Sequence, residues 1–215
     1  SSAIKAKAKE NQQLLANLEE KETALFKEEA ELRKLKAALE ARSKRIADLE
    51  ALIASKEAAM QTLKEAISKA LIGFKGKGLT VEHRDGKIYV SMDNKLLFRS
   101  GKWVVGTEGK AAVVELAKVL VENPDIHVLI EGHTDNVPYK GTVILDNWDL
   151  SVKRATAIVR ILQRNKVSPQ QITAAGRSEY NPVENNTTKE GKAKNRRIEI
   201  ILSPNLDEVT KLLNE

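Results

Sequence analysis

The sequence predicts an α+β domain preceded by a long N-terminal α-helical coiled coil. Residues 1–72 contain neither Gly nor Pro, and their abundance of Ala, Glu, Lys and Leu is typical of a long helix. Apolar residues recur at seven-residue intervals through the same segment. Beyond it, alternating segments typical of strands are interleaved with segments of helical periodicity, which favours a two-layer βαβαβ mixed sheet with helices on one face.

Composition and charge exclude several classes of function. The chain carries 36 Lys and Arg against 30 Asp and Glu, and because the two signs are interleaved we expect a solvated surface and no nucleic-acid partner. The absence of Cys excludes disulfides, thiolate metal sites and thiol nucleophiles. No apolar run approaches the roughly 20 residues that span a bilayer, and the first ten residues hold no signal-peptide core.

The heptad pattern predicts a left-handed coiled coil over residues 1–72. Its main seam consists of Ile4, Asn11, Leu18, Leu25, Leu32, Leu39, Ile46, Ile53, Met60 and Ile67. The second seam position, three residues later, alternates Leu with charged residues. We expect a homo-oligomer, most simply a parallel dimer in which Asn11 fixes the register, although a trimer stays open. A single solvated helix, or one folded back on its neighbour, is the alternative.

Glycines separate this segment from the rest of the chain. Gly73, Gly76 and Gly78 predict a linker over residues 73–78, followed by a domain over 79–203 and a C-terminal helix within 204–215. The expected elements are a hairpin over 79–92 turning at Asp85-Gly86, a loop or short strand over 93–105, a helix over 107–122 capped by Thr107, strands over 126–131, 171–175 and 197–202, a helix starting at Asn147, and a polar loop over 176–194.

The stretch 126–160 carries the candidate site. Ile126, Val128 and Ile130 alternate as in a largely buried strand, and ligands in such folds lie outside the carboxyl ends of strands. Asp135 follows that end. Arg154 lies seven residues after Asn147, the expected N-cap, and two helical turns place both on the loop-facing side of the helix.

Two interpretations of Asp135 and Arg154 follow from their chemistry. They form a structural salt bridge with each other, which is the simpler case because most such pairs are structural. Alternatively they hold a zwitterion between them, the guanidinium taking a carboxylate and the aspartate taking an ammonium. The second interpretation predicts an amino acid as the ligand.

Three ordered strings resemble a known family. GHTDNVP (132–138), NWDLSVKRA (147–155) and NRRIEI (195–200) resemble the OmpA C-terminal-like family, which includes OmpA, Pal and the flagellar stator protein MotB, and the resemblance covers residues 79–203. It implies non-catalytic binding of peptidoglycan through the diaminopimelate of its stem peptide. It also implies a periplasmic protein, associated with the outer membrane, that anchors the outer membrane or cell envelope to the cell wall.

The resemblance assigns roles residue by residue. Asp135 matches the acid that binds the diaminopimelate amino group, and Arg154 matches the arginine that binds its carboxylate. The other matching positions are Asn147 and Thr134 as supporting contacts, Arg196 near the pocket, and Ser100 and Gly101 in a loop whose amides approach the ligand. The loop between Asp135 and Asn147 is longer than in OmpA and Pal, with extra residues that include 139–141, and in this respect the sequence is more similar to MotB. A leader or anchor preceding Ser1, such as a lipidated Cys or a membrane helix, is a further expectation, and membrane association would depend on it.

Other functions remain as alternatives. One is a flagellar-stator wall anchor, and another is a coiled-coil scaffold whose C-terminal domain docks another protein. Ser151, His133 and Asp135 supply hydrolase residue types, but no G-x-S-x-G elbow is present and Ser151 falls in a first helical turn. We therefore expect no enzyme.

The remaining candidates concern metals, sugars and phosphates. His83, His127 and His133 are widely spaced without a paired-ligand motif, so we expect neither metal nor cofactor. Trp103 and Trp148 suit stacking on sugar rings, yet we expect at least one of them in the core. Strand alternation sends Arg196 and Arg197 to opposite faces.

Overall fold

The structure of the chain, a computed structural model, describes residues 2–99 and 101–214. Ser100, one of the predicted site residues, lies outside the described residues. The chain divides into two compact units, Ser1–Leu52 and Ile53–Glu215. Helix α1 (Ser2–Ala70) supplies all of the described first unit and the beginning of the second.

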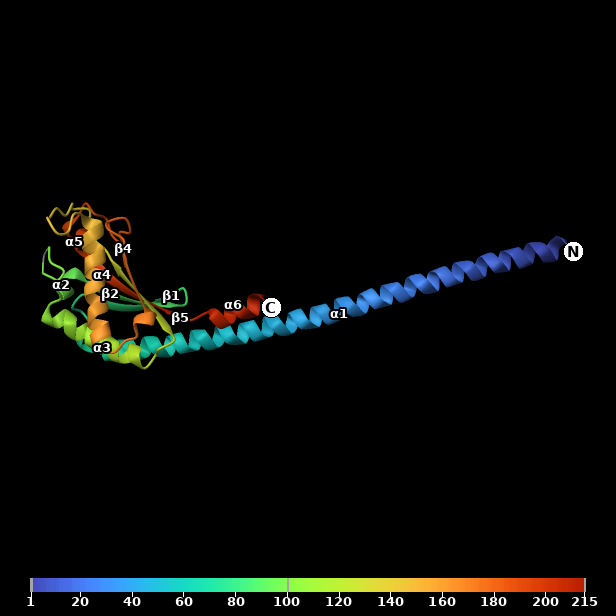
Figure 1. The fold of residues 1–215 in the computed structure, drawn as a ribbon, viewed down its shortest axis with the longest axis horizontal. Coiled ribbons are helices and arrows are strands. Elements are labelled where there is room, and N and C mark those ends of the chain that lie inside the picture. Colours follow the sequence, from blue (N-terminus) through green and yellow to red (C-terminus); the bar gives the residue numbers. More distant parts are fainter. Residues whose placement is uncertain (1, 100, 215) are drawn as a thin grey trace. The chain divides into compact units, whose positions relative to one another are not determined.

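The first unit is the blue part of α1 in Figure 1. Its heptad side chains are exposed: Leu18, Leu25 and Ile46 are each more than half accessible to solvent. An exposed apolar stripe of this length is the surface that a partner helix would cover. The expected coiled-coil association therefore stays a prediction that this stripe supports.

The second unit begins inside α1 and not at the glycines. Met60, Leu63 and Ile67 are at most 4% exposed and belong to the domain core. The sequence placed them in the coiled coil, because a heptad stripe has the same spacing whether it packs on a second helix or on a sheet. Helix α1 ends at Ala70, and a short 3₁₀ helix, η1 (Ile72–Phe74), follows.

Five strands form one sheet. They are β1 (Leu79–Arg84), β2 (Lys87–Asp93), β3 (Ile126–Gly132), β4 (Ile172–Gly176) and β5 (Arg197–Pro204). Their order is β1-β2-β5-β3-β4, with β3 and β4 parallel and the other neighbours antiparallel. Asp85 and Gly86 form the hairpin turn with φ of 52° and 67°, as the dipeptide predicted.

Two long helices, α3 (Thr107–Val121) and α4 (Asn147–Arg164), cover one face of this sheet (Figure 1). Alternate residues of the central strands, such as Ile130 and Ile200, are fully buried in one cluster with Leu116 and Ile158 of the helices. The predicted fold class, a two-layer mixed sheet with helices on one face after a long helix, is confirmed. The alternation of apolar residues with period two in the strands produces this single buried face.

Three short helices complete the second unit: α2 (Asn94–Leu97), α5 (Lys189–Asn195) and α6 (Asp207–Asn214). A second 3₁₀ helix, η2 (Pro169–Gln171), precedes β4. The sequence placed α2 in a loop or short strand and α5 in a loop, since neither is long enough to show a period. Within the described part of the chain, no helix combines the length and the apolar character needed to cross a bilayer.

Two helix caps differ from expectation. Asp146, not Asn147, caps α4, and its Oδ1 accepts a hydrogen bond from the Asp149 amide at 3.0 Å. Gly106, not Thr107, is the N-cap of α3 and makes no side-chain cap bond. Both Asp and Asn are good N-caps, so the adjacent Asp146 takes the role and leaves the Asn147 side chain for other contacts.

Candidate functional site

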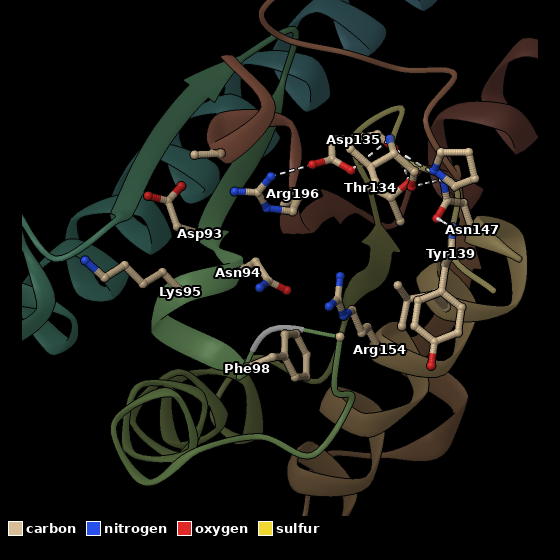
Figure 2. Close-up of a pocket in the computed structure, with 15 residues that line it drawn as sticks. Asp93, Asn94, Lys95, Phe98, Thr134, Asp135, Tyr139, Asn147, Arg154 and Arg196 are labelled. Carbon is tan, nitrogen blue, oxygen red and sulfur yellow. Dashed lines mark hydrogen bonds and ion pairs between the residues drawn. The ribbon is translucent and has the colours of Figure 1, made fainter. Parts of the chain in front are cut away.

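A cleft of about 610 Å³ lies at the carboxyl end of β3. Its walls come from four segments that are distant in sequence: the start of α2, the loop after β3, the first two turns of α4, and the end of α5 (Figure 2). The lining residues include Asp93, Asn94, Phe98, Gly101, Thr134, Asp135, Tyr139, Asn147, Arg154 and Arg196. Every predicted site residue that the structure describes therefore lines one cleft.

Asp135 is buried, with 6% exposure, and its carboxylate is held on both oxygens. Oδ1 accepts from the Val137 amide at 3.2 Å, and Oδ2 pairs with Nη1 of Arg196. The simpler of the two interpretations, a structural pair between Asp135 and Arg154, is wrong because Arg196 takes that place. A carboxylate has about four acceptor positions, so these two bonds leave room for a further donor.

Arg154 is 3% exposed and points into the cleft (Figure 2). Its Nε donates to the Lys102 carbonyl at 3.1 Å, and its Cζ lies 5.3 Å from the centre of the Phe98 ring. Burial and the nearby Arg196 lower the pKa of Arg154 to about 10, against the raising effect of Asp135 and Tyr139. The guanidinium therefore stays protonated at neutral pH.

The charge of Arg154 lacks a close counterion. Among the described residues no ion pair reaches its guanidinium, since the carboxylate of Asp135 pairs with Arg196. A buried cation without an anion costs free energy. A ligand carboxylate in the cleft would remove that cost and would suit the planar, forked guanidinium.

Asn147 and Thr134 position the loop that carries Asp135. Nδ2 of Asn147 donates toward the carbonyls of Asp135 at 3.3 Å and Val137 at 3.1 Å, while its Oδ1 accepts from the Tyr139 amide at 3.2 Å. The Thr134 hydroxyl donates to the Asp135 carbonyl at 2.9 Å. Both side chains are buried, so their hydrogen bonds fix the conformation of this loop.

Two glycines let α4 approach the strand ends. A Cβ atom on Gly132 would overlap the carbonyl oxygen of Ser151, and a Cβ atom on Gly176 would overlap the hydroxyl oxygen of Ser151. The first turns of α4 therefore lie directly against the ends of β3 and β4. This contact brings Asn147 and Arg154 to the loop that carries Asp135.

The comparisons with known proteins agree with this geometry. Residues 97–196 match the model of the OmpA family, and the structure of the cell wall anchor of the T6SS from Pseudomonas aeruginosa superposes with a TM-score of 0.60. That structure is 30% identical in sequence, and the match covers 97% of it and 65% of this chain. The chain belongs to the OmpA family.

Two curated relatives extend the comparison of this OmpA family chain. Motility protein B of Bacillus subtilis is 37% identical over 118 residues, which are 54% of this chain and 45% of the relative. Peptidoglycan-binding protein ArfA of Mycobacterium tuberculosis is 39% identical over 80 residues, which are 37% of this chain and 23% of the relative. The chain spans about half the length, between 45% and 57%, of the first curated relatives it matches.

Sequence reasoning missed several residues of the OmpA family cleft. Phe98 lines the cleft next to Arg154. Glu179 does not line it, but its side chain accepts a hydrogen bond from Asn147 Nδ2 at 2.8 Å. Oδ1 of Asn94 is buried without a hydrogen-bond partner in the described part of the chain, and Figure 2 shows this side chain facing the cleft. Residues 94–98 carry no periodic pattern, so nothing in the sequence marks them as part of a binding site.

His133 lies outside the cleft, on the sheet face that the helices do not cover. It is 1% exposed, and its Nε2 lies 3.6 Å from Glu131 and 3.9 Å from Glu199, which are paired across β3 and β5. Nε of Arg197 bonds Glu199 at 2.8 Å, and Nε of Arg177 lies 3.7 Å from Glu131. These arginines neutralise both carboxylates, so the cluster lacks the excess negative charge that a divalent cation needs.

The two Trp residues, Ser151 and the Arg196–Arg197 pair were the other candidates from the sequence. Neither Trp lies in the core of the OmpA family domain: Trp103 is half-buried, and Trp148 is 47% exposed. The Ser151 hydroxyl donates to the Trp148 carbonyl at 2.8 Å and accepts from the Ser178 amide at 3.2 Å, as expected of a structural serine. The expectation that Arg196 and Arg197 diverge is confirmed, since Arg196 pairs with Asp135 and Arg197 with Glu199.

Proposed function

We propose that this OmpA family domain binds peptidoglycan without catalysis and anchors an envelope structure to the cell wall. The observation that carries the proposal is the buried Arg154, a cation facing the cleft with no ion-pair partner among the described residues, beside an acidic Asp135 with acceptor capacity left. A relative named for peptidoglycan binding and a similar structure described as a cell wall anchor support it.

The ligand group that fits these charges is the zwitterionic head of diaminopimelate, or of an equivalent residue, in the stem peptide. Its carboxylate pairs with the two free amino groups of the Arg154 guanidinium. Its ammonium takes the remaining acceptor positions of Asp135. The orphaned Oδ1 of Asn94 offers a further acceptor on the same wall. No bond is made or broken in this scheme.

The anchoring role involves the rest of the chain. The exposed heptad stripe of residues 4–53 joins copies into a homo-oligomer, and the helix serves as a spacer between the wall-binding domain and its attachment. We place the protein in the periplasm, in association with the outer membrane. Similarity to Motility protein B favours a second candidate, in which the same wall contact holds a flagellar stator.

Cosedimentation with purified diaminopimelate-containing sacculi tests the proposal. The wild-type chain is expected in the pellet, whereas Arg154→Ala and Asp135→Ala each lose affinity by at least about 30-fold. That loss corresponds to the roughly 2 kcal/mol or more expected when one partner of a buried charge pair is removed. Circular dichroism confirms that each variant is folded.

Arg160→Ala is the matched control, because Arg160 is exposed on the same helix, and it should pellet like wild type. Wild-type sedimentation that both cleft variants retain would show that the site is wrong. A folded wild-type chain that stays in the supernatant would instead favour the scaffold that docks another protein.

A further inference from the structure

We infer that Trp148 and Tyr180 form a second subsite beside the cleft that takes the sugar rings of the glycan strand. The inference rests on the proposed function, since it assigns a place to the glycan part of the same ligand. The two rings come from different segments, the first turn of α4 and the turn after β4, and their centroids lie 5.6 Å apart with 30° between the planes.

Both rings are open to solvent. Trp148 is 47% exposed and Tyr180 is 70% exposed, although large aromatic side chains usually gain most by burial. Val143 and Leu145, in the loop between Asp135 and Asn147, are also exposed apolar residues. An exposed aromatic pair gains stability by covering an apolar surface, and the C–H face of a pyranose ring is such a surface.

The backbone around the pair is fixed while the rings stay free. The Glu179 side chain accepts from Nδ2 of Asn147 at 2.8 Å, the Asn181 carbonyl accepts from Arg197 at 3.3 Å, and the Tyr180 amide donates to the Arg177 carbonyl at 3.2 Å. The residues on both sides of Tyr180 are therefore tied to the domain. Binding a ring on this surface orders little of the protein, which favours affinity.

Neither ring lines the cleft, but both follow residues that connect to it: Asn147 lines the cleft, and its Nδ2 donates to the Glu179 side chain at 2.8 Å. Trp148 follows Asn147, with consecutive Cα atoms about 3.8 Å apart. Two residues separate the diamino acid of a stem peptide from its muramic sugar, and they span about 7 Å when extended. A wall fragment whose diamino acid occupies the cleft can therefore lay its sugars on Trp148 and Tyr180.

Fluorescence of Trp148 tests the inference directly. The chain contains two Trp residues, so Trp103→Phe leaves Trp148 as the single reporter. This variant is titrated with a diaminopimelate-containing stem tripeptide and with the disaccharide that carries the same tripeptide. We expect both ligands to bind, and the disaccharide form to bind about tenfold more tightly. A tenfold difference in affinity corresponds to about 1.4 kcal/mol, which is the size of one aromatic contact. Only the disaccharide form should shift the emission of Trp148.

Tyr180→Ala in the same background separates the subsite from the cleft. Its ring is exposed, so the fold should persist. The disaccharide form should then bind only as tightly as the tripeptide, whose affinity should not change. Tyr180→Phe keeps the ring face and should restore the difference.

The outcomes distinguish the two proposals. Equal affinities for both ligands, or an unchanged preference in Tyr180→Ala, would overturn the glycan subsite and leave the stem-peptide site intact. If neither fragment binds and sacculi do not pellet the protein, the proposed function itself fails. A protein partner on this surface would appear as the first of these outcomes, because the sugars would then contribute nothing.

Discussion

Arg154 illustrates a residue whose burial opposes stability. The residue is 3% exposed, and the pKa of its guanidinium is lowered to about 10, chiefly because burial disfavours the charge. Arg154→Met keeps much of the side-chain volume and removes the buried cation. We expect the free energy of unfolding of the ligand-free protein to stay equal or rise by about 1 kcal/mol, while sacculus binding is lost. Urea unfolding measures the first quantity, and cosedimentation measures the second.

Arg160→Met provides the comparison for this substitution. Arg160 is exposed on α4, so both stability and wall binding should remain unchanged there. A stability loss of more than about 2 kcal/mol in Arg154→Met would mean that the guanidinium holds the fold together through its bond to the Lys102 carbonyl, and would remove the argument that the site is poised for an anion.

We expect His133 to make the stability of the fold depend on pH in the acid range. Burial, together with Arg197 and Arg177, lowers its pKa from 6.5 to about 3, whereas the unfolded chain protonates it near 6.5. Between these values the unfolded state binds more protons, so the free energy of unfolding falls as pH falls, by about 1.4 kcal/mol per pH unit for this group. Glu131 and Glu199 face the same ring and are themselves held by the arginines.

His133→Gln should therefore flatten the dependence of stability on pH between 6.5 and 4. Thermal or urea unfolding at a series of pH values measures the slope. His127→Gln is the control, since His127 is exposed on the same strand and should leave the slope unchanged. Equal slopes for wild type and His133→Gln would show that this ring does not cause the acid sensitivity.

At the scale of single residues, the sequence predicted which side chains line the cleft better than it predicted which of them form ion pairs with each other. The position of Asp135 was predictable because it follows the end of a strand. The positions of Asn147 and Arg154 were predictable from the start of a helix and from the helical period. The pairing of Asp135 with Arg196 joins residues far apart in sequence, and no local pattern ranks Arg196 above Arg154 as its partner. The contribution of Asn94 depends on a four-residue helix without a period.

At the scale of elements, one heptad stripe on α1 serves two kinds of contact. Ile67 is fully buried in the domain core, whereas Ile46, three heptads earlier, is 55% exposed. Ile67→Ala should lower the free energy of unfolding of the domain by about 2 to 5 kcal/mol, as for other buried large-to-small substitutions. Ile46→Ala should leave that transition unchanged and weaken only the association between copies.

Chemical unfolding and sedimentation velocity measure these two effects separately. The contrast fails if Ile67→Ala unfolds like wild type, or if both substitutions weaken the oligomer equally. There is a physical reason why the sequence did not reveal the boundary between the two units near residue 53. A period of seven reports only that one side of a helix is apolar, and it carries no information on whether a helix or a sheet covers that side.

For the whole molecule, the order of the main strands and helices was predictable because each shows its own period. The sheet order β1-β2-β5-β3-β4 is less accessible, since the last strand inserts between two earlier ones. That insertion has a functional result. It brings the end of α5 and Arg196 beside the loop after β3, and so completes a cleft in which Asp135 and Arg154 lie 61 and 42 positions earlier in the sequence.

The continuity of α1 has a mechanical consequence. The helix that leaves the domain toward the N-terminus also contributes Met60, Leu63 and Ile67 to its interior. When the domain is fixed at the wall and the N-terminal segment is pulled, tension does not stop at a flexible connector on the surface. It travels along the helix axis to side chains packed inside the domain, where slippage requires all of them to shear past their neighbours together.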